Sequence, residues 1–192
     1  MGKYSSLTDL ELLRKISAQD SRALEELYDR YSTILYTLIK KIVTDKRIAE
    51  IILVDVFSII WTKSGKLNFE NSSVYTWIIT LTRNRAVDNL RRTKTPADTP
   101  DVYNDEYENY FIIPFLDENI DFLDLKTAAN IRPKMAAAMD KLTDAQKYVL
   151  QLSYYQGFTL GEISEKLKLP IEAVREKMMG AVHSLRQHLL GG

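Results

Sequence analysis

The sequence contains no cysteine, and its 192 residues include only two histidines, seven glycines and five prolines. Without cysteine the chain forms no disulfide and offers no thiolate zinc site. His183 and His188 are five residues apart, so a helix would not place them on one face as a metal pair. The sequence therefore predicts no metal site built from cysteine or histidine. The low glycine and proline content is unlike that of fibrous or disordered chains.

Long uncharged runs are also missing. No uncharged stretch reaches the roughly 20 residues that a membrane-spanning helix requires. No cationic leader followed by an apolar segment opens the printed sequence. We therefore expect a cytoplasmic protein.

The chain has no excess of either charge, because 26 basic side chains balance 26 acidic ones. The charges are nevertheless segregated: residues 1–97 carry 16 basic and 11 acidic groups, residues 98–126 carry 1 and 9, and residues 127–192 carry 9 and 6. Two mildly basic blocks that flank an acidic, proline-containing stretch predict two domains joined by a linker. Nonspecific affinity for DNA grows with the number of phosphates neutralised, so we expect the chain alone to hold DNA weakly.

Residues 1–97 predict four helices. Thr8 with Glu11 makes a capping box before a short first helix, and Asp20 or Ser21 caps a longer second one. Apolar residues recur in that second helix at steps of three and four, which predicts an inner stripe of Leu24, Leu27, Tyr31, Ile34, Leu38 and Ile42.

The third helix begins at Asp45, ends at Ser64 and Gly65, and carries more apolar residues than one buried face uses. Its predicted inner stripe is Ala49, Ile52, Val56 and Ile60. The surplus residues indicate either burial on two sides of a small bundle or a surface for a partner, and the sequence leaves both open. This surplus consists of Ile51, Leu53, Phe57, Ile59 and Trp61.

The fourth helix, about residues 73–93, begins apolar and aromatic and ends cationic. Cations at a helix C-terminus are favoured by the helix dipole, which accounts for Arg91 and Arg92 structurally. Aromatic residues beside arginines also bind unstacked bases and the nucleic-acid backbone. From this helix alone, we favour the helix dipole over nucleic-acid binding as the explanation for Arg91 and Arg92.

The middle stretch, residues 98–126, shows no sustained helical or strand period, and Pro114 interrupts its apolar patch. We predict an extended linker that orders against a partner. Calcium-loop spacing and its glycine are missing, so the carboxylates do not predict a metal site.

Residues 127–192 carry the most specific local pattern. Thr143 with Gln146 opens a helix that stops at Gly157, and Thr159 with Glu162 opens a short second one. Pro170 starts a third helix after a tight turn, which makes a helix-turn-helix, although helical hairpins in general give similar patterns. The second helix of such a unit enters the major groove of DNA. Its outward residues here are Glu172, Arg175, Glu176, Lys177, Met179, Gly180 and His183.

Taken together, these blocks resemble the extracytoplasmic-function (ECF) group of bacterial RNA polymerase sigma factors. The resemblance is carried by residues 49–61, 77–92 and 159–167, and it extends over residues 7–190. It implies an all-α protein with two small domains, residues 1–97 and 127–192, joined by the acidic linker 98–126. It also implies an initiation subunit with no enzymatic activity and no cofactor.

The resemblance further implies sites and partners. The first domain docks on the clamp helices of the largest polymerase subunit, through Asp55, Val56, Phe57, Ile60 and Trp61. The helix-turn-helix reads the minus-thirty-five element of promoter DNA through Thr159 and the outward residues of its last helix, and an anti-sigma factor is a possible further partner. Minus-ten recognition falls between Asn68 and Arg92, with Phe69, Tyr75 and Trp77 as aromatics, Thr76, Thr80 and Asn84 as polar readers, and Arg83, Arg91 and Arg92 as phosphate clamps.

Some residues depart from the family pattern. Val54 stands where many members carry glutamine, and Gly180 stands where arginine is common. Glu172 and Glu176 add negative charge where phosphates approach, although each could accept a hydrogen bond from cytosine. Two other hypotheses stay open: a helix-turn-helix regulator that acts without polymerase, and a degenerate helical interaction protein.

Overall fold

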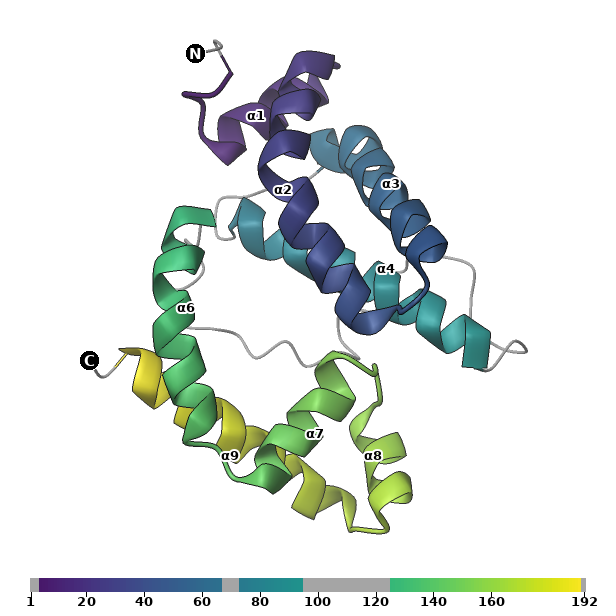
Figure 1. Cartoon of the computed structure of the whole chain (residues 1–192), viewed down its shortest axis with the longest axis vertical. Helices are drawn as coiled ribbons and strands as arrows, with labels where there is room; N and C mark the ends of the chain where they lie inside the picture. Colours follow the sequence, from purple (N-terminus) through teal and green to yellow (C-terminus); the bar gives the residue numbers. More distant parts are fainter. Residues whose placement is uncertain (1–3, 67–72, 95–124, 191–192) are drawn as a thin grey trace. The chain divides into compact units, whose positions relative to one another are not determined.

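The computed structural model describes residues 4–66, 73–94 and 125–190, and these ranges contain helices and turns without any strand. They form two compact units (Figure 1). Of the described residues, the first unit contains 4–66, 73–90 and Leu125, and the second contains 91–94 and 126–190. The predicted all-α fold class is confirmed. The linker bounds 98–126 fall almost wholly outside the described residues.

The helices of the first unit begin where their capping residues predict. Helix α1 (Asp9–Ser17) follows the Thr8 and Glu11 capping box, in which the Glu11 N–H donates to Thr8 Oγ1 at 3.2 Å. Asp20 caps α2 (Ser21–Ile42), and Asp45 caps α3 (Lys46–Lys63). A short 3-10 turn, η1 (Ser64–Lys66), ends the third helix, and α4 (Val74–Lys94) follows.

The core of the first unit lies between α1, α2, α3 and α4. The predicted inner stripe of α3, Ala49, Ile52, Val56 and Ile60, is buried. On α2 the predicted stripe is only partly right, because Leu24, Ile34 and Leu38 are half-buried at its edges. The residues of α2 that the core buries are Ala23, Leu27, Tyr31, Leu35, Ile39 and Ile42.

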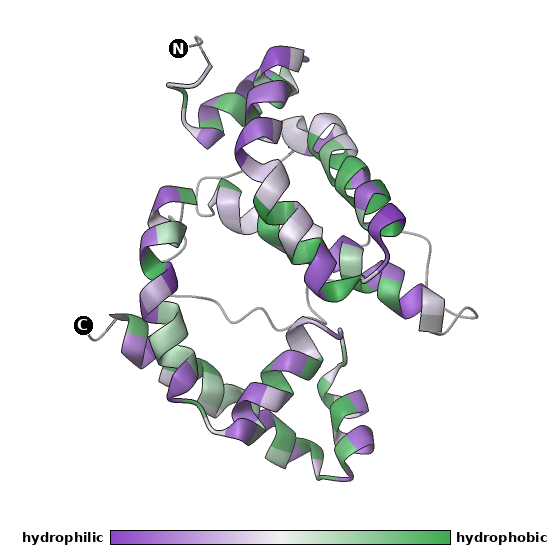
Figure 2. Ribbon diagram, in the orientation of Figure 1, coloured by the Kyte–Doolittle hydropathy of each residue, from purple (hydrophilic) through white to green (hydrophobic). Residues whose placement is uncertain are grey.

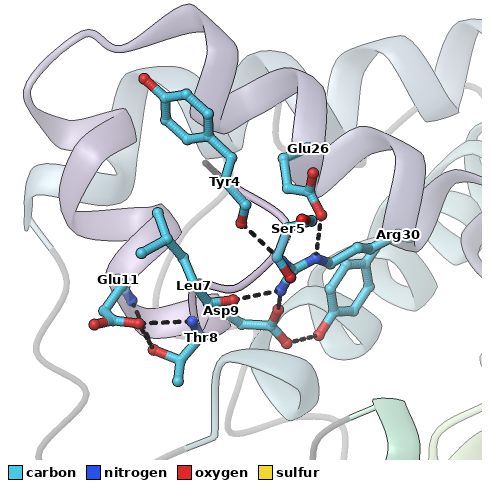
Figure 3. Close-up of polar contacts among 9 residues, drawn as sticks. Tyr4, Ser5, Leu7, Thr8, Asp9, Glu11, Glu26 and Arg30 are labelled. Atoms are coloured by element: carbon cyan, nitrogen blue, oxygen red, sulfur yellow. Dashed lines mark hydrogen bonds and ion pairs between the residues drawn. The ribbon is translucent and has the colours of Figure 1, made fainter. Parts of the chain in front are cut away.

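Arg30 on α2 forms hydrogen bonds with residues 4–7, which precede α1, and with Asp9 at the start of α1 (Figure 3). Its Nη1 donates to the Leu7 carbonyl and to Asp9 Oδ1, both at 2.9 Å, and its Nε donates to Glu26 Oε1 at 2.8 Å. The buried Tyr31 hydroxyl donates to the other Asp9 oxygen at 2.6 Å. Burial and this bond raise the pKa of Tyr31. One guanidinium and one carboxylate thus join α1 to α2.

Replacing Arg30 with methionine is expected to lower the free energy of unfolding of the first unit by about 2 kcal/mol, because hydrogen bonds to charged groups each contribute about 1.5 to 3 kcal/mol. Both tryptophans, Trp61 and Trp77, lie in this unit, so tryptophan fluorescence during urea unfolding reports on it selectively. Arg47→Met removes an exposed cation and is expected to change the same free energy by less than about 0.5 kcal/mol. Equal losses in the two variants would contradict the anchoring role.

The second unit contains the predicted helix-turn-helix. The Thr143 capping box opens α7 (Asp144–Tyr154) and the Thr159 capping box opens α8 (Leu160–Leu167), as predicted. Lys168 then adopts the left-handed conformation, with φ of 53°, and α9 (Ile171–Leu190) begins one residue after Pro170. A cluster of five buried residues forms the hydrophobic core of the helix-turn-helix: Val149, Leu152, Ile163, Val174 and Met178.

Helix α6 (Leu125–Asp140) is an element that the sequence analysis missed. Ala138 is its one buried residue in the described part of the chain, and Pro133 lies within it. Few buried apolar residues and an internal proline weaken the signal for a helix at the sequence level. None of the helices in the described ranges combines the length and the apolar character that a bilayer-spanning helix needs.

Candidate functional site

The apolar surplus of α3 is divided between the core and the surface. Leu53 and Phe57 are 8% and 6% exposed and pack inside, whereas Ile51 and Val54 are 61% and 66% exposed. Burial on two sides therefore accounts for Leu53 and Phe57, and a surface for a partner stays a prediction for the exposed Ile51. Figure 2 shows apolar colour along much of α3.

Three of the five residues predicted for polymerase docking are buried in the first unit. Val56 and Ile60 have no exposure and Phe57 has little, so all three stabilise the core and do not present a contact surface. Asp55 and Trp61 are half-buried and reach solvent. A helix buried on two sides has one narrow free face, and the sequence pattern does not show which residues occupy it.

The free face of α3 begins with Ile51 and Val54, which are three residues apart and therefore neighbours on the helix. Tyr28 of α2 is 44% exposed, and its ring packs on Phe57 of α3 with 4.8 Å between the ring centroids. We call Tyr28, Ile51 and Val54 the α3 apolar face. Exposed apolar residues gathered in this way are typical of a protein-binding surface.

An ion pair joins α3 to α4. The Nε of Arg85 donates to Oδ2 of Asp55 at 2.7 Å, and Nη2 of Arg85 contacts the same oxygen. The side chains keep 26% and 39% of their exposure. The sequence predicts no role for Arg85, because the 30 residues between Asp55 and Arg85 leave no local signal of their contact.

The polar and aromatic residues predicted for minus-ten recognition lie along the first half of α4. Tyr75, Thr76, Trp77 and Thr80 are all half-buried. The ring of Tyr75 lies 6.3 Å from that of Tyr31, and burial raises the pKa of Tyr75. Each of these side chains is thus partly packed against the first unit and partly exposed to solvent. Asn68 and Phe69 lie outside the described residues.

Two residues predicted to reach DNA lie inside the first unit. Arg83 is 3% exposed and Asn84 is 5% exposed, and Nη1 of Arg83 donates to Oδ1 of Asn84 at 3.1 Å. A buried guanidinium needs hydrogen-bond partners, and an amide oxygen supplies one. In this conformation neither side chain faces a phosphate. Among the other cations predicted for DNA, Arg91 is half-buried and Arg92 is exposed.

One exposed face of α9 carries most of the residues predicted to read DNA. Glu172, Arg175, Glu176, Met179 and His183 are exposed at steps of three and four, so they form a single stripe. Lys177 is half-buried beside it. Arg175 pairs with Glu172 at 3.7 Å, and Met179 is 65% exposed. The stripe carries two carboxylates and one arginine, which suits contacts to bases better than neutralisation of phosphates.

Thr159 is occupied with capping α8. Its Oγ1 accepts the Glu162 N–H at 3.2 Å, and its own N–H donates to Glu162 Oε2 at 2.7 Å. Thr159 therefore fixes the start of the helix that precedes the reading helix. No group of histidine and carboxylate side chains that could hold a metal ion occurs in the described part of the chain.

Two family models match the chain. The model of Sigma-70 region 2 matches residues 27–95, and the model of Sigma-70, region 4 matches residues 138–187. The first range contains α3 and α4, and the second contains the helix-turn-helix.

Curated relatives match over nearly the whole chain. The ECF RNA polymerase sigma factor SigK of Mycobacterium sp. (strain KMS) is 27% identical over 184 residues, 95% of this chain and 91% of the relative. The protein of the same name from Mycobacterium tuberculosis (strain ATCC 25618 / H37Rv) is 26% identical over 184 residues, 95% of this chain and 94% of the relative. A solved structure of CnrH in complex with the cytosolic domain of CnrY covers 92% of this chain and 94% of its own, at 15% identity and a TM-score of 0.41.

Proposed function

Because this chain belongs to the ECF group of RNA polymerase sigma factors, which direct the core enzyme to promoters, we propose a division of labour between its two domains. The first domain binds core polymerase and the minus-ten element, and the second reads the minus-thirty-five element. The observation that carries the proposal is the match to regions 2 and 4, in that order, in one chain. Neither alternative, a polymerase-independent regulator or a degenerate interaction protein, is favoured by it.

Docking on the polymerase clamp helices uses the α3 apolar face together with Asp55 and Trp61. Exposed aliphatic residues supply area that is removed from water in a complex. Asp55 supplies a charge at the edge of that area, and a rim charge contributes to specificity and association rate. Support comes from the 61% and 66% exposure of Ile51 and Val54 on a helix whose other apolar residues are buried or half-buried.

Strand separation at the minus-ten element is driven by binding energy. Duplex melting costs about 1 to 2 kcal/mol per base-pair step, and the sequence has no nucleotide-hydrolysis motif to supply work. A base stacked on an aromatic side chain recovers about 1 to 3 kcal/mol. Phe69, Tyr75 and Trp77 are the aromatic residues proposed for this role, with Thr76 and Thr80 as polar readers on α4.

Reading of the minus-thirty-five element uses the exposed stripe of α9. Carboxylates accept hydrogen bonds from the cytosine amino group in the major groove, and Met179 offers apolar contact to a thymine methyl. With so few cations on this stripe, phosphate attraction contributes little. The contact between α9 and the minus-thirty-five element then contributes more to the choice of promoter sequence than to the affinity for DNA.

An anti-sigma factor remains a proposed partner. The α3 apolar face is the surface that such an inhibitor would cover, because covering it excludes polymerase. A competition measurement tests this: an anti-sigma protein that binds the chain should be displaced by core polymerase, and Ile51→Asp should weaken both complexes.

Transcription in vitro with purified core polymerase across a promoter library tests the proposed function. Core enzyme with this protein is expected to start transcripts at a restricted set of promoters, whereas core enzyme alone starts none of them. The protein alone should give little specific footprint. A strong footprint from the free protein, or transcription that does not depend on it, would contradict the proposal.

Changing Arg91 and Arg92 together to alanine is expected to lower open-complex formation at these promoters about tenfold or more, because two phosphate contacts are lost. The affinity for core polymerase measured without DNA should stay within about twofold, since neither arginine lies on α3. Raising the salt concentration should inhibit the wild type more steeply than the variant. Normal open-complex formation in the variant would rule out the phosphate-clamp assignment.

A further inference from the structure

The Asp55 and Arg85 ion pair links the helix proposed to bind polymerase with the helix proposed to bind the minus-ten element. Arg85 directs two donors, Nε and Nη2, at the single oxygen Oδ2 of Asp55. No other described residue forms a hydrogen bond or ion pair with the Asp55 carboxylate, so Oδ1 is left for an outside donor. The Asp55 side chain keeps 39% of its exposure, which is enough to reach one.

The position of Asp55 on α3 places that free oxygen beside the α3 apolar face. Asp55 follows Ile51 by four residues and Val54 by one, so it borders the exposed aliphatic side chains. A charge at the rim of an apolar contact is partly desolvated in a complex and then discriminates strongly among partners. Such a charge contributes most to the binding affinity when its side chain is already held in one conformation, since less side-chain conformational entropy is then lost on binding.

We propose that Arg85 is a positioning residue for polymerase docking: it holds Asp55 so that Oδ1 receives a cationic side chain of the polymerase. Arg85 itself does not contact the polymerase. The inference rests on the proposed function, and it adds that the docking surface on α3 is completed from α4. The side chain of Arg85 thereby connects α4, the helix proposed to bind the minus-ten element, with the polymerase-docking surface on α3.

A double-mutant cycle on core affinity tests the inference. Core polymerase is titrated, in the absence of DNA, into labelled full-length wild type, Asp55→Asn, Arg85→Met and the double variant. Each single change is expected to weaken binding about tenfold, and the double variant should bind no more weakly than Asp55→Asn, because Arg85 acts only through Asp55. Lys46→Met removes a cation from an exposed ion pair on the same helix and should leave the affinity within about twofold.

The reversed pair separates positioning from a merely structural role. In the variant Asp55→Arg with Arg85→Asp the ion pair is restored, so the melting temperature should match that of the wild type. Core affinity should nevertheless stay at or below that of Asp55→Asn, since the outward charge now has the wrong sign. Recovery of core affinity in the reversed pair would overturn the inference.

Two other outcomes are also decisive. If Arg85→Met binds core polymerase as tightly as the wild type or more tightly, Arg85 does not prepare Asp55 and the inference fails alone. If the wild type does not bind core polymerase, the proposed function fails and the inference fails with it. Arg85→Lys, which keeps a cation opposite Asp55, is expected to recover part of the affinity that methionine loses.

Discussion

Core polymerase is expected to bind the double variant Ile51→Asp with Val54→Asp about a hundredfold or more weakly than the wild type, because two charges would be buried at the centre of an apolar contact. Both side chains are more than half exposed, so the fold should not change. Titration of labelled protein with core enzyme measures the affinity. Tryptophan fluorescence during urea unfolding measures the stability of the first unit.

The matched control for this variant is Val54→Gln, which places at this position the residue that many family members carry. It removes apolar area without adding charge, and the expected loss of affinity is less than about fivefold. Transcription should fall in parallel with core affinity, because promoter recognition requires the assembled enzyme. Full affinity in the double aspartate variant would show that polymerase docks elsewhere, and the α3 apolar face would then lose its assignment.

Local sequence signals predicted where the helices begin. Side chains cap the N–H groups three residues ahead, so Thr8, Asp20, Asp45, Thr143 and Thr159 could each be identified from their own neighbourhood. The spacing of apolar residues likewise predicted the helix-turn-helix and the buried stripe of α3. These features depend on contacts within a few residues, and a sequence displays such contacts directly.

Features that depend on packing could not be predicted in the same way. The apolar pattern placed Val56 and Ile60 in the buried stripe of α3, whereas the family resemblance assigned both to polymerase docking; the structure buries them and exposes Ile51 and Val54. The family resemblance assigned Arg83 to a phosphate contact, and the structure buries its side chain. Its burial depends on Asn84 and on the surrounding helices. The Asp55 and Arg85 pair spans 30 residues and exists only once α3 and α4 meet.

Replacing Ile163 with aspartate should unfold the helix-turn-helix unit and leave the first unit folded. Ile163 has no exposure and lies in a core of five buried residues, so an aspartate there carries an unpaired charge into apolar surroundings. The cost of several kcal/mol is a large part of the about 5 to 15 kcal/mol that stabilises a typical domain. Far-UV circular dichroism should show loss of helix, while the fluorescence of Trp61 and Trp77 stays native.

This selective loss separates the two proposed tasks. Core affinity should fall by less than about tenfold, because the α3 apolar face lies in the unit that stays folded. Transcription should fall about a hundredfold at promoters that need the upstream element, since the reading stripe of α9 is no longer formed. Gln187→Ala on the exposed part of α9 leaves the core intact and should preserve both the helix content and the native melting curve. If Ile163→Asp abolished core binding while the tryptophan signal stayed native, polymerase docking would depend on the second unit, and the division of labour between the domains would be wrong.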